Sequence, residues 1–574
     1  MDLGTIVVTG TRFHSTLASQ TQRVTIITRE EIESMPAKSV PELLSYVSGV
    51  DVIDKSGFGI QGDIGIRGAT FQETQILIDG IRVNDSQTAH HNMDLPISFE
   101  DIDRIEILHG GGSSVYGPDG MGGVINIITK REKEDKLESK VSFGNNRTTG
   151  LGLRYSKAFR NMIQAVSVEK RDSDGFRYDT DYEQMVLSSH SHWIIPSGDI
   201  RLLLGYMDKE FGAFDFYTPG SNLPSREWTE TKFFTSSANL SIGKYIFSPR
   251  VFFRRHNDDF VLDQENPEFY SNRHIKESIG TEISGEIPLK GWGRIILGGE
   301  LAEESIDSSN LGVHNRLRHA LFSEYRYEIL GRINLDVGGR YDYSDWGNVY
   351  SPKIGGAFYP LSKWKVYTNY SKAFRQPSFT ELYYESPINK GDEDLMSERD
   401  DSYEVGLAFL SSRYFTIQCS VFQRKAKNLI DWGKERETDI KWQVMNIGRA
   451  GFKGIDIGGL IESRDWVFRL GYSQIDSDTE QEYISKYGFK HLLYKGVISL
   501  EVPFPFGIRQ NWQGLYRERD GEEGCLIFST RLLHRIDNFT ISVDIQNIFN
   551  EQNTDSAQDY IHPRWLGLTV ECIM

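Results

Sequence analysis

The sequence predicts a fold dominated by β-structure, in which an antiparallel transmembrane β-barrel of about 22 strands encloses a small N-terminal α/β domain. Three observations predict this class. Long segments in which apolar and polar residues alternate fill the chain after roughly residue 132. Tyr, Phe and Trp residues gather near the ends of these segments, as in the aromatic girdles of membrane barrels. The chain also has no run of about 18 apolar residues, which excludes an ordinary membrane-spanning helix.

The composition agrees with a barrel that is apolar on one face only. The chain has 574 residues, of which 39% are hydrophobic and 12% aromatic, with a mean hydropathy of -0.43. Its net charge of -17 argues against nucleic-acid binding, because phosphate contacts need a positive surface. The three cysteines, Cys419, Cys525 and Cys572, are far apart and predict neither a disulfide framework nor a metal knuckle. Asp2 follows Met1 without a basic and apolar leader, so we expect an export signal to have been removed from this numbering.

The first part of the chain differs from the rest. We expect residues 1–20 to form a terminal segment and linker, residues 21–131 a mixed α/β domain, and residues 132–574 the barrel. Thr28 precedes two glutamates, which is typical of a capped helix start. Residues 124–129 are nearly all apolar or β-branched, as a strand buried on both faces would be.

The remaining residues alternate as barrel strands do. In residues 333–343 the odd positions are Ile, Leu, Val, Gly, Tyr and Tyr, while the even positions are mostly polar or charged. Residues 539–546 and 566–574 repeat this pattern. A soluble antiparallel β protein also alternates. The number and length of the segments, their terminal aromatic residues and their polar faces favour the barrel, with roughly 20 residues for each of about 22 strands and its loop.

Three strings in the N-terminal domain carry a family resemblance. They are residues 64–68 (IGIRG), 75–83 (QILIDGIRV) and 103–129, which contains HGGGSSVYGPDGMGGVINIIT. Together and in this order they resemble the plug domain of TonB-dependent outer-membrane transporters. The glycines of the third string could instead cradle a phosphate, but no Lys-Ser or Lys-Thr follows at the required spacing, so we expect no nucleotide site.

The resemblance implies a function. It predicts active uptake of a scarce nutrient through a plugged barrel in the lipid of the bacterial outer membrane, driven by the TonB complex of the inner membrane. It implies no catalysis. A hydrolase is the distant alternative, and neither a Gly-x-Ser-x-Gly elbow nor a His-Glu-x-x-His helix supports it.

The N-terminal segment is similar to the Ton box of this family, the extended strand that TonB is understood to capture by strand addition. A β-branched run suits that mode of binding. An ordinary edge strand is the alternative. The resemblance assigns TonB binding to Leu3, Gly4, Thr5, Ile6, Val7, Val8 and Thr9.

The resemblance also implies a set of ion pairs that lock the plug in the barrel. The arginine of the first string is retained as Arg67, but the usual second arginine is replaced by His109. We expect Glu398 and Glu404 of the barrel to be their partners. A lock that used His109 would weaken as the ring lost its proton near neutral pH.

A polar loop over residues 86–94 follows a plug strand and is predicted to face the incoming cargo. We expect Phe58, Gln61, His90, His91 and Asn92 to form the cargo surface. Plain loop structure and metal binding are the alternatives for the two histidines. Neighbouring side chains rarely point the same way, so one loop cannot complete a tetrahedral metal site.

Two barrel stretches, residues 172–176 and 205–221, resemble early extracellular loops of the cobalamin receptors within the family. The resemblance implies cobalamin as cargo and calcium as a loop-ordering ion, because calcium binds six to eight oxygens. A solvated acidic turn is the alternative. The expected calcium ligands are Asp172, Asp174, Asp208 and Asp215, with Asp179 or Asp181 as additions.

A ferric siderophore is the main alternative cargo, since siderophore pockets leave little trace in sequence. Haem is disfavoured, because no histidine lies between residues 374–377 and 394–398, where haem receptors of the family carry one. A surface lipoprotein could cover the mouth of the barrel.

Overall fold

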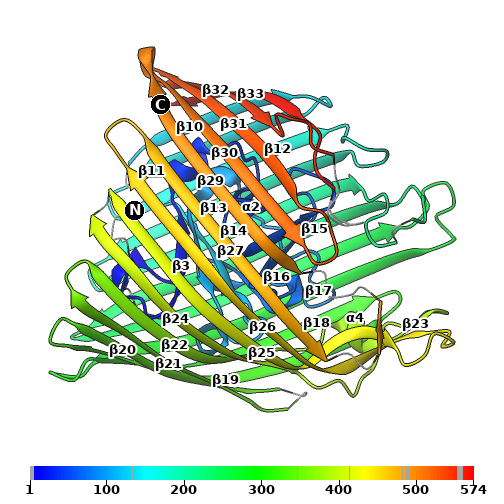
Figure 1. Cartoon of the computed structure of the whole chain (residues 1–574), viewed down its shortest axis with the longest axis horizontal. Coiled ribbons are helices and arrows are strands. Elements are labelled where there is room, and N and C mark those ends of the chain that lie inside the picture. The colour runs from blue at the N-terminus through cyan, green and yellow to red at the C-terminus, as the bar shows by residue number, and fades with distance from the viewer. Residues whose placement is uncertain are drawn as a thin grey trace.

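A closed β-barrel of 22 antiparallel strands surrounds an N-terminal domain in the computed structural model of the protein (Figure 1). The structure describes residues 6–13, 15–131, 134–218, 220–344, 347–412, 414–480, 483–486, 491–552 and 560–574. The barrel closes where β10 (Lys136–Gly144) pairs with β33 (Trp565–Ile573), with Phe143 opposite Leu568. The predicted fold class is therefore confirmed.

The barrel strands follow one another round the wall in sequence order. They are β10, β11 (Thr149–Ala158), β12 (Met162–Ser173), β13 (Tyr182–Ile195), β14 (Gly198–Gly212), β15 (Arg226–Ile242), β16 (Tyr245–Val261), β17 (Ser271–Pro288), β18 (Arg294–Ser308), β19 (Gly312–Ile329), β20 (Ile333–Tyr343), β21 (Val349–Leu361), β22 (Trp364–Arg375), β24 (Glu398–Ser412), β25 (Phe415–Lys434), β26 (Trp442–Glu462), β27 (Val467–Glu480), β29 (Leu492–Phe504), β30 (Ile508–Arg519), β31 (Cys525–Ile536), β32 (Phe539–Gln546) and β33. Short turns join them at the end where the C-terminus lies, and longer loops at the other. Loop elements at the long-loop end are α4 (Phe379–Tyr383), β23 (Asn389–Lys390) and β28 (Ile484–Ser485).

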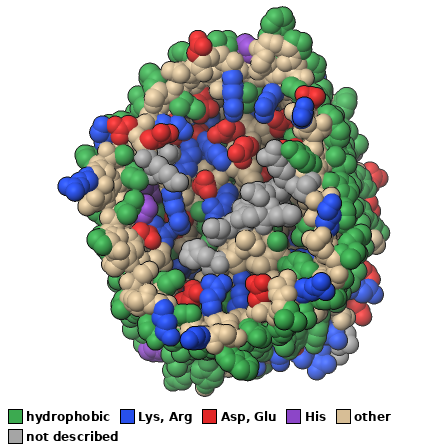
Figure 2. Space-filling view, turned by 90° about the vertical axis from the view of Figure 1, so that its left-hand side faces the viewer, with side chains coloured by type: hydrophobic (Ala, Val, Ile, Leu, Met, Phe, Trp, Pro, Cys, Tyr) green, Lys and Arg blue, Asp and Glu red, His purple; other side chains and the backbone are tan. Residues whose placement is uncertain are grey.

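The barrel wall is apolar outside and charged inside. In β20, Val337 and Tyr341 are 45% and 44% exposed, whereas Asp336 and Arg340 are fully buried. A soluble protein would reverse this arrangement, so the outer face is suited to lipid. Figure 2 views the molecule from the short-turn end and shows hydrophobic side chains on the outer wall around an interior rich in Lys, Arg, Asp and Glu. No helix among the described residues is long and apolar enough to cross a membrane.

The N-terminal domain fills the barrel with a mixed sheet and short helices. Its sheet has the strand order β3-β8-β9-β6-β7, in which only β6 and β9 run parallel. The elements are β1 (Ile6–Val7), β2 (Ser15–Thr16), β3 (Val24–Ile27), α1 (Arg29–Ser34), α2 (Val40–Ser45), β4 (Val50–Asp54), β5 (Gly62–Ile66), β6 (Thr74–Ile78), β7 (Ile81–Arg82), β8 (Ile102–His109), α3 (Ser113–Tyr116) and β9 (Gly123–Thr129), with single 3-10 turns at 17–19, 71–73 and 99–101. The predicted cap of α1 is present, because Thr28 and Glu31 form a capping box. Every residue of β9 is buried, as predicted.

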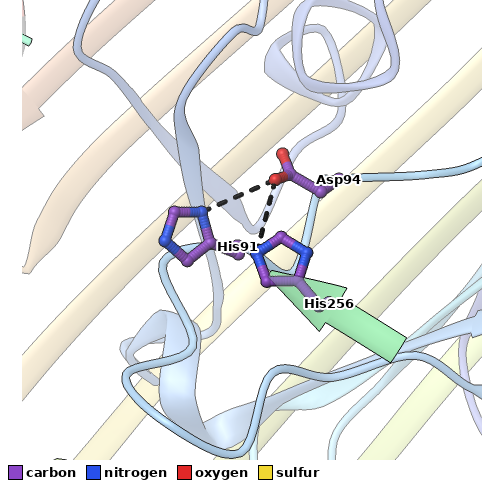
Figure 3. A group of neighbouring side chains, drawn as sticks. All are labelled: His91, Asp94 and His256. Carbon is purple, nitrogen blue, oxygen red and sulfur yellow. Dashed lines mark ion pairs between the residues drawn. The ribbon is translucent and has the colours of Figure 1, made fainter. Parts of the chain in front are cut away.

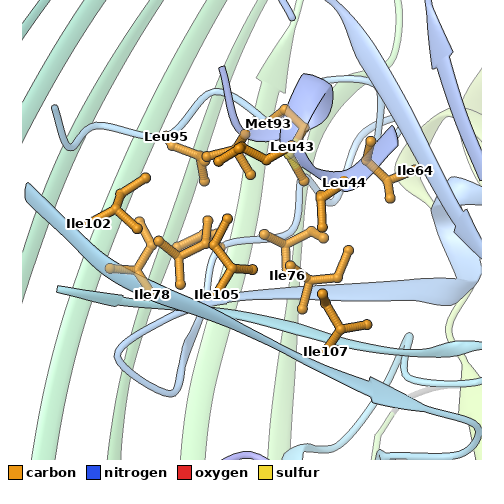
Figure 4. Packing of buried hydrophobic residues seen from close by; sticks show 14 of the residues in the cluster. Leu43, Leu44, Ile64, Ile76, Ile78, Met93, Leu95, Ile102, Ile105 and Ile107 are labelled. Carbon is orange, nitrogen blue, oxygen red and sulfur yellow. The ribbon is translucent and has the colours of Figure 1, made fainter. Parts of the chain in front are cut away.

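An apolar core holds this domain together. Leu43 and Leu44 of α2 pack on the sheet against Ile76, Ile105 and Ile107 (Figure 4). Leu44, Ile105 and Ile107 are fully buried. The domain therefore has a hydrophobic core, which also contacts apolar residues of the barrel wall such as Phe233 and Phe252.

Candidate functional site

The N-terminal segment is docked on the sheet of the N-terminal domain. Ile6 and Val7 pair with β2, and Val7 is fully buried. The Val8 N–H donates to Glu106 Oε2 at 2.9 Å, and the Thr9 hydroxyl donates to the same oxygen at 2.7 Å. The Tyr116 hydroxyl donates to the Val8 carbonyl at 2.8 Å. The backbone groups of residues 6–8 are thus already paired within the N-terminal domain.

Leu3, Gly4 and Thr5 of the predicted Ton box lie outside the described residues. Glu106, which holds the following residues, was not predicted. It is one of two acids in β8, and only the three-dimensional position of the N-terminal segment gives it a role.

Arg67 joins the N-terminal domain to the barrel. Its guanidinium lies 2.9 Å from Glu404 Oε1 and 2.7 Å from Asp456 Oδ2, and it sits over the ring of Phe422. Arg67 and both carboxylates are nearly fully buried. The structure therefore brings together Arg67 and Glu404, while the second carboxylate, Asp456, was missed because nothing around it in the sequence marks it.

Two predicted members of the lock are wrong. Glu398 lies 2.7 Å from Arg375, which also pairs with Glu381, so it does not pair with Arg67. His109 Nε2 lies 2.9 Å from the Thr25 hydroxyl, and no ion pair joins His109 to a carboxylate among the described residues. Burial first, then the positive charges of Arg23 and Arg67, lower the pKa of His109 well below its ordinary value, so the ring is neutral.

The predicted cargo residues lie at the boundary between the plug and the barrel. Phe58 packs against Trp565 and is 2% exposed. Gln61 Oε1 lies 2.8 Å from the Tyr217 hydroxyl oxygen, so the barrel loop after β14 covers Gln61. Asn92 Oδ1 accepts from the Asp85 N–H at 2.7 Å inside its own loop. A cargo molecule would reach these side chains only after the covering loop moved.

The two adjacent histidines face different partners. His90 Nδ1 lies 3.0 Å from Asp63 Oδ1, and its side chain keeps 23% of its exposure. His91 points to the barrel, where Nε2 lies 3.3 Å from Glu227 and 3.6 Å from Asp258. Figure 3 shows the other side of this ring, with Nδ1 facing Asp94. Burial alone would lower the pKa of His91, but Glu227, Asp258 and Asp94 raise it well above its ordinary value. This position favours a positive charge.

The four predicted calcium ligands are spread over strands and loops. Asp172 accepts from the Thr149 hydroxyl at 2.7 Å, and Asp174 lies exposed beside Arg147. Asp208 is exposed on β14, whose neighbouring residues Met207 and Lys209 are buried. Asp215 accepts from the Asn222 N–H at 3.1 Å. Among the described residues, no group of three ligand atoms within 4.8 Å of one another includes any of these aspartates. Calcium binding therefore stays a prediction.

Comparisons with known proteins agree with the fold and with the family. The chain is 25% identical over 493 residues, 79% of this chain and 74% of the relative, to the vitamin B12 transporter BtuB of Vibrio cholerae serotype O1. Among solved structures it is similar to the siderophore receptor PirA of Pseudomonas aeruginosa, with a TM-score of 0.78, 17% identity and coverage of 96% and 99% of the two chains. A ferric enterobactin receptor (PfeA) mutant of the same species has a TM-score of 0.82 at 15% identity, with 97% and 99% covered.

Two family models match the two parts of the chain. Residues 16–124 match the TonB-dependent receptor plug domain, and residues 131–524 match the TonB-dependent receptor-like β-barrel. The matched regions correspond to the lumenal domain and to most of the closed barrel. The chain therefore belongs to the TonB-dependent receptors, and it is an outer-membrane β-barrel that carries out TonB-dependent transport.

Proposed function

We propose that this receptor takes up cobalamin. The observation that carries the proposal is the similarity to curated vitamin B12 transporters over 79% of the chain. The likeness of residues 172–176 and 205–221 to extracellular loops of cobalamin receptors supports it. In the structure the second stretch includes Tyr217, which covers Gln61 of the plug.

The proposed mechanism follows from two features of the structure: the backbone of the N-terminal segment is already paired, and the predicted cargo residues are covered. Cobalamin binds at the long-loop end, where the loop containing Tyr217 lifts from Gln61 and exposes Phe58 and His90. The N-terminal segment is released from Glu106, and TonB then binds it by strand addition. Force on that segment displaces the plug from the barrel wall at contacts such as Arg67 to Glu404, and cobalamin passes.

Ferric siderophore uptake is the second candidate function. The solved structures that resemble this chain are named as receptors for siderophores, including ferric enterobactin. Their identity to this chain is 15–17%, so they support the fold and leave the cargo to experiment.

Equilibrium binding to the purified receptor in detergent tests the cargo. We expect cyanocobalamin to bind with a Kd on the order of nanomolar, and ferric enterobactin to fail to displace it. The Gln61→Ala variant should bind cyanocobalamin more weakly, while Gln418→Ala, which removes an amide bonded to Tyr367 on the barrel wall, should bind normally. If the receptor bound a ferric siderophore and did not bind cyanocobalamin, siderophore uptake would replace cobalamin uptake as the leading proposal.

The same assay tests calcium. Cyanocobalamin affinity should rise with calcium and fall with a chelator if the aspartates order the loops over the cargo. The Asp215→Asn variant should lose this dependence. An affinity that is indifferent to calcium would remove the ion from the proposal and leave cobalamin uptake standing.

A further inference from the structure

Three polar atoms without hydrogen-bond partners among the described residues meet between the plug and the barrel wall. They are Nδ1 of His91, Oδ2 of Asp94 and Nε2 of His256 (Figure 3). His91 Nδ1 lies 3.6 Å from Asp94 Oδ2, and His256 Nε2 lies 3.9 Å from the same oxygen. The side chains are 3%, 3% and 0% exposed. Among the buried polar atoms without partners, these three stand out because they converge on one another and are all of types that bind metal ions.

The opposite nitrogens of the two rings are held by other groups. His256 Nδ1 lies 2.8 Å from the Thr231 hydroxyl. His91 Nε2 faces Glu227 at 3.3 Å, and the Tyr217 hydroxyl fixes Glu227 by donating to it at 2.6 Å. With a proton on each of these outer nitrogens, both inner nitrogens direct a lone pair toward Asp94. Metal-binding histidines characteristically use their second nitrogen in this way.

The surrounding charges favour one more cation. Asp94 Oδ1 is bound by Lys209 at 2.5 Å, which leaves Oδ2 available. Lys276 is 3.0 Å from Asp85, and the buried Arg254 lies close to both aspartates. The carboxylates of this cluster are Asp85, Asp94, Glu227 and Asp258, and its basic side chains are Lys209, Lys276 and Arg254. With both rings neutral, one unit of negative charge remains. Without a metal ion a proton on His91 balances this charge, and a metal ion bound at Nδ1 would replace that proton.

We propose that His91, Asp94 and His256 bind a divalent transition-metal ion of the zinc class. Two imidazole nitrogens and one carboxylate oxygen suit zinc and its neighbours, whereas calcium selects a shell of oxygens. Zinc bonds of about 2.0 Å place tetrahedral ligand atoms about 3.3 Å apart. The three ligand atoms here lie within 4.8 Å of one another, so the side chains would move closer together when the ion binds. The fourth position is open to water or to a donor atom of an incoming molecule.

The opposite side of the His91 ring is a weaker candidate for the ion. Glu227 and Asp258 form a second group of potential ligands with His91. That group has a single imidazole, and one oxygen of Glu227 already accepts the Tyr217 hydroxyl. We assign Glu227 and Asp258 to the orientation of His91 and place the ion on its Nδ1 side.

The site joins two separate parts of the molecule. His91 and Asp94 belong to the plug loop, and His256 belongs to β16 of the barrel. A bound ion therefore ties this loop to the barrel wall, and an ion lost during transport would free it. This inference is independent of the cargo, because it depends only on side chains that meet in the resting receptor.

Calorimetry on the purified, chelator-treated full-length receptor tests the site. We expect the protein to bind one Zn²⁺ per chain and to bind Ca²⁺ far more weakly at these residues. His256→Asn should weaken Zn²⁺ binding by more than about 100-fold, and Thr231→Val by about 10-fold to 100-fold through loss of ring orientation. His274→Asn is the matched control, because His274 is a buried histidine on the next strand whose Nδ1 lies 2.8 Å from the Ser308 hydroxyl.

Folding and ligand identity are checked separately. The Asp94→Asn variant keeps the shape of the side chain and should also lose Zn²⁺, so it decides the question if His256→Asn fails to assemble a barrel. X-ray absorption should show two imidazoles at about 2.0 Å from zinc in the wild type and one in His256→Asn. Zinc binding that is absent from the wild type, or unchanged in His256→Asn and Asp94→Asn, would overturn the proposal. Binding that survives His256→Asn and is lost in Glu227→Gln would overturn the assignment to Nδ1.

Discussion

The interior of the plug and its boundary with the barrel are built from different interactions. The interior is apolar, with Leu44, Ile76 and Ile105 packed between helix and sheet. The boundary adds buried ion pairs to apolar contacts such as that of Phe58 with Trp565. Arg67 meets Glu404 and Asp456, and Arg519 of the barrel meets Asp51 of the plug. Water can replace polar partners, but it cannot replace apolar contacts. The difference suggests that the plug can separate from the wall while it stays folded.

The largest expected effect comes from breaking the charged boundary. Arg67→Met leaves Glu404 and Asp456 buried without their cation, which should cost about 3–5 kcal/mol of plug attachment. Hydrogen exchange that monitors release of the plug as denaturant is added measures this free energy of attachment. Lys453→Met is the control, because Lys453 and Asp476 form an exposed pair and its loss should change nothing measurable. If Arg67→Met and Lys453→Met released the plug at the same denaturant concentration, Arg67 would not hold the plug in the barrel.

A cavity in the plug interior should weaken the fold of the plug rather than its attachment to the barrel. Leu44→Ala removes a fully buried side chain and should destabilise the plug fold by about 3 kcal/mol. Hydrogen exchange should then accelerate for amides of β8 and β9, while the release midpoint measured for the Arg67 variant stays closer to that of the wild type. If Leu44→Ala released the plug as readily as Arg67→Met, the two regions would not be separable.

The smallest expected effect is the pH response of His109. Its pKa is lowered in the folded protein, while the unfolded chain binds a proton below about pH 6.5. Stability is therefore unaffected above that pH and falls as the pH drops below it, by about 1.4 kcal/mol at pH 5.5. The difference between wild type and His109→Gln in the release midpoint, measured from pH 7.5 to 5.5, isolates this contribution. If the wild-type release midpoint rose at low pH, a protonated His109 would stabilise the contact between plug and barrel, as predicted from the sequence.

Local pattern predicted most of the fold and part of the site. The alternation of residues such as Asp336 and Val337 predicts the wall, because the strand period alone decides which side chain faces lipid. The first family string predicted Arg67, and the lock that the resemblance implies predicted Glu404 as its partner, together with Glu398, which pairs elsewhere. Asp456 was missed because its partner depends on the register of β26 against the plug, which no local pattern records.

The same reason explains the buried histidine cluster. His91 could be singled out as a loop histidine, but His256 lies in a run of polar and charged residues, 254–259, where nothing in the sequence marks it as a ligand. Only the closed barrel brings β16 beside the plug loop. Burial of Phe58 and Gln61 likewise depends on how a distant barrel loop folds back over the plug.

The central claim is that TonB pulls the N-terminal segment and so parts the plug from the wall along its charged boundary. Uptake of a labelled cargo that binds the purified receptor, in cells with wild-type receptor or with a receptor lacking residues 3–9, tests it most directly. The account predicts that the deletion keeps cargo binding at the cell surface and abolishes accumulation inside the cell. Accumulation at the wild-type rate without residues 3–9 would contradict it.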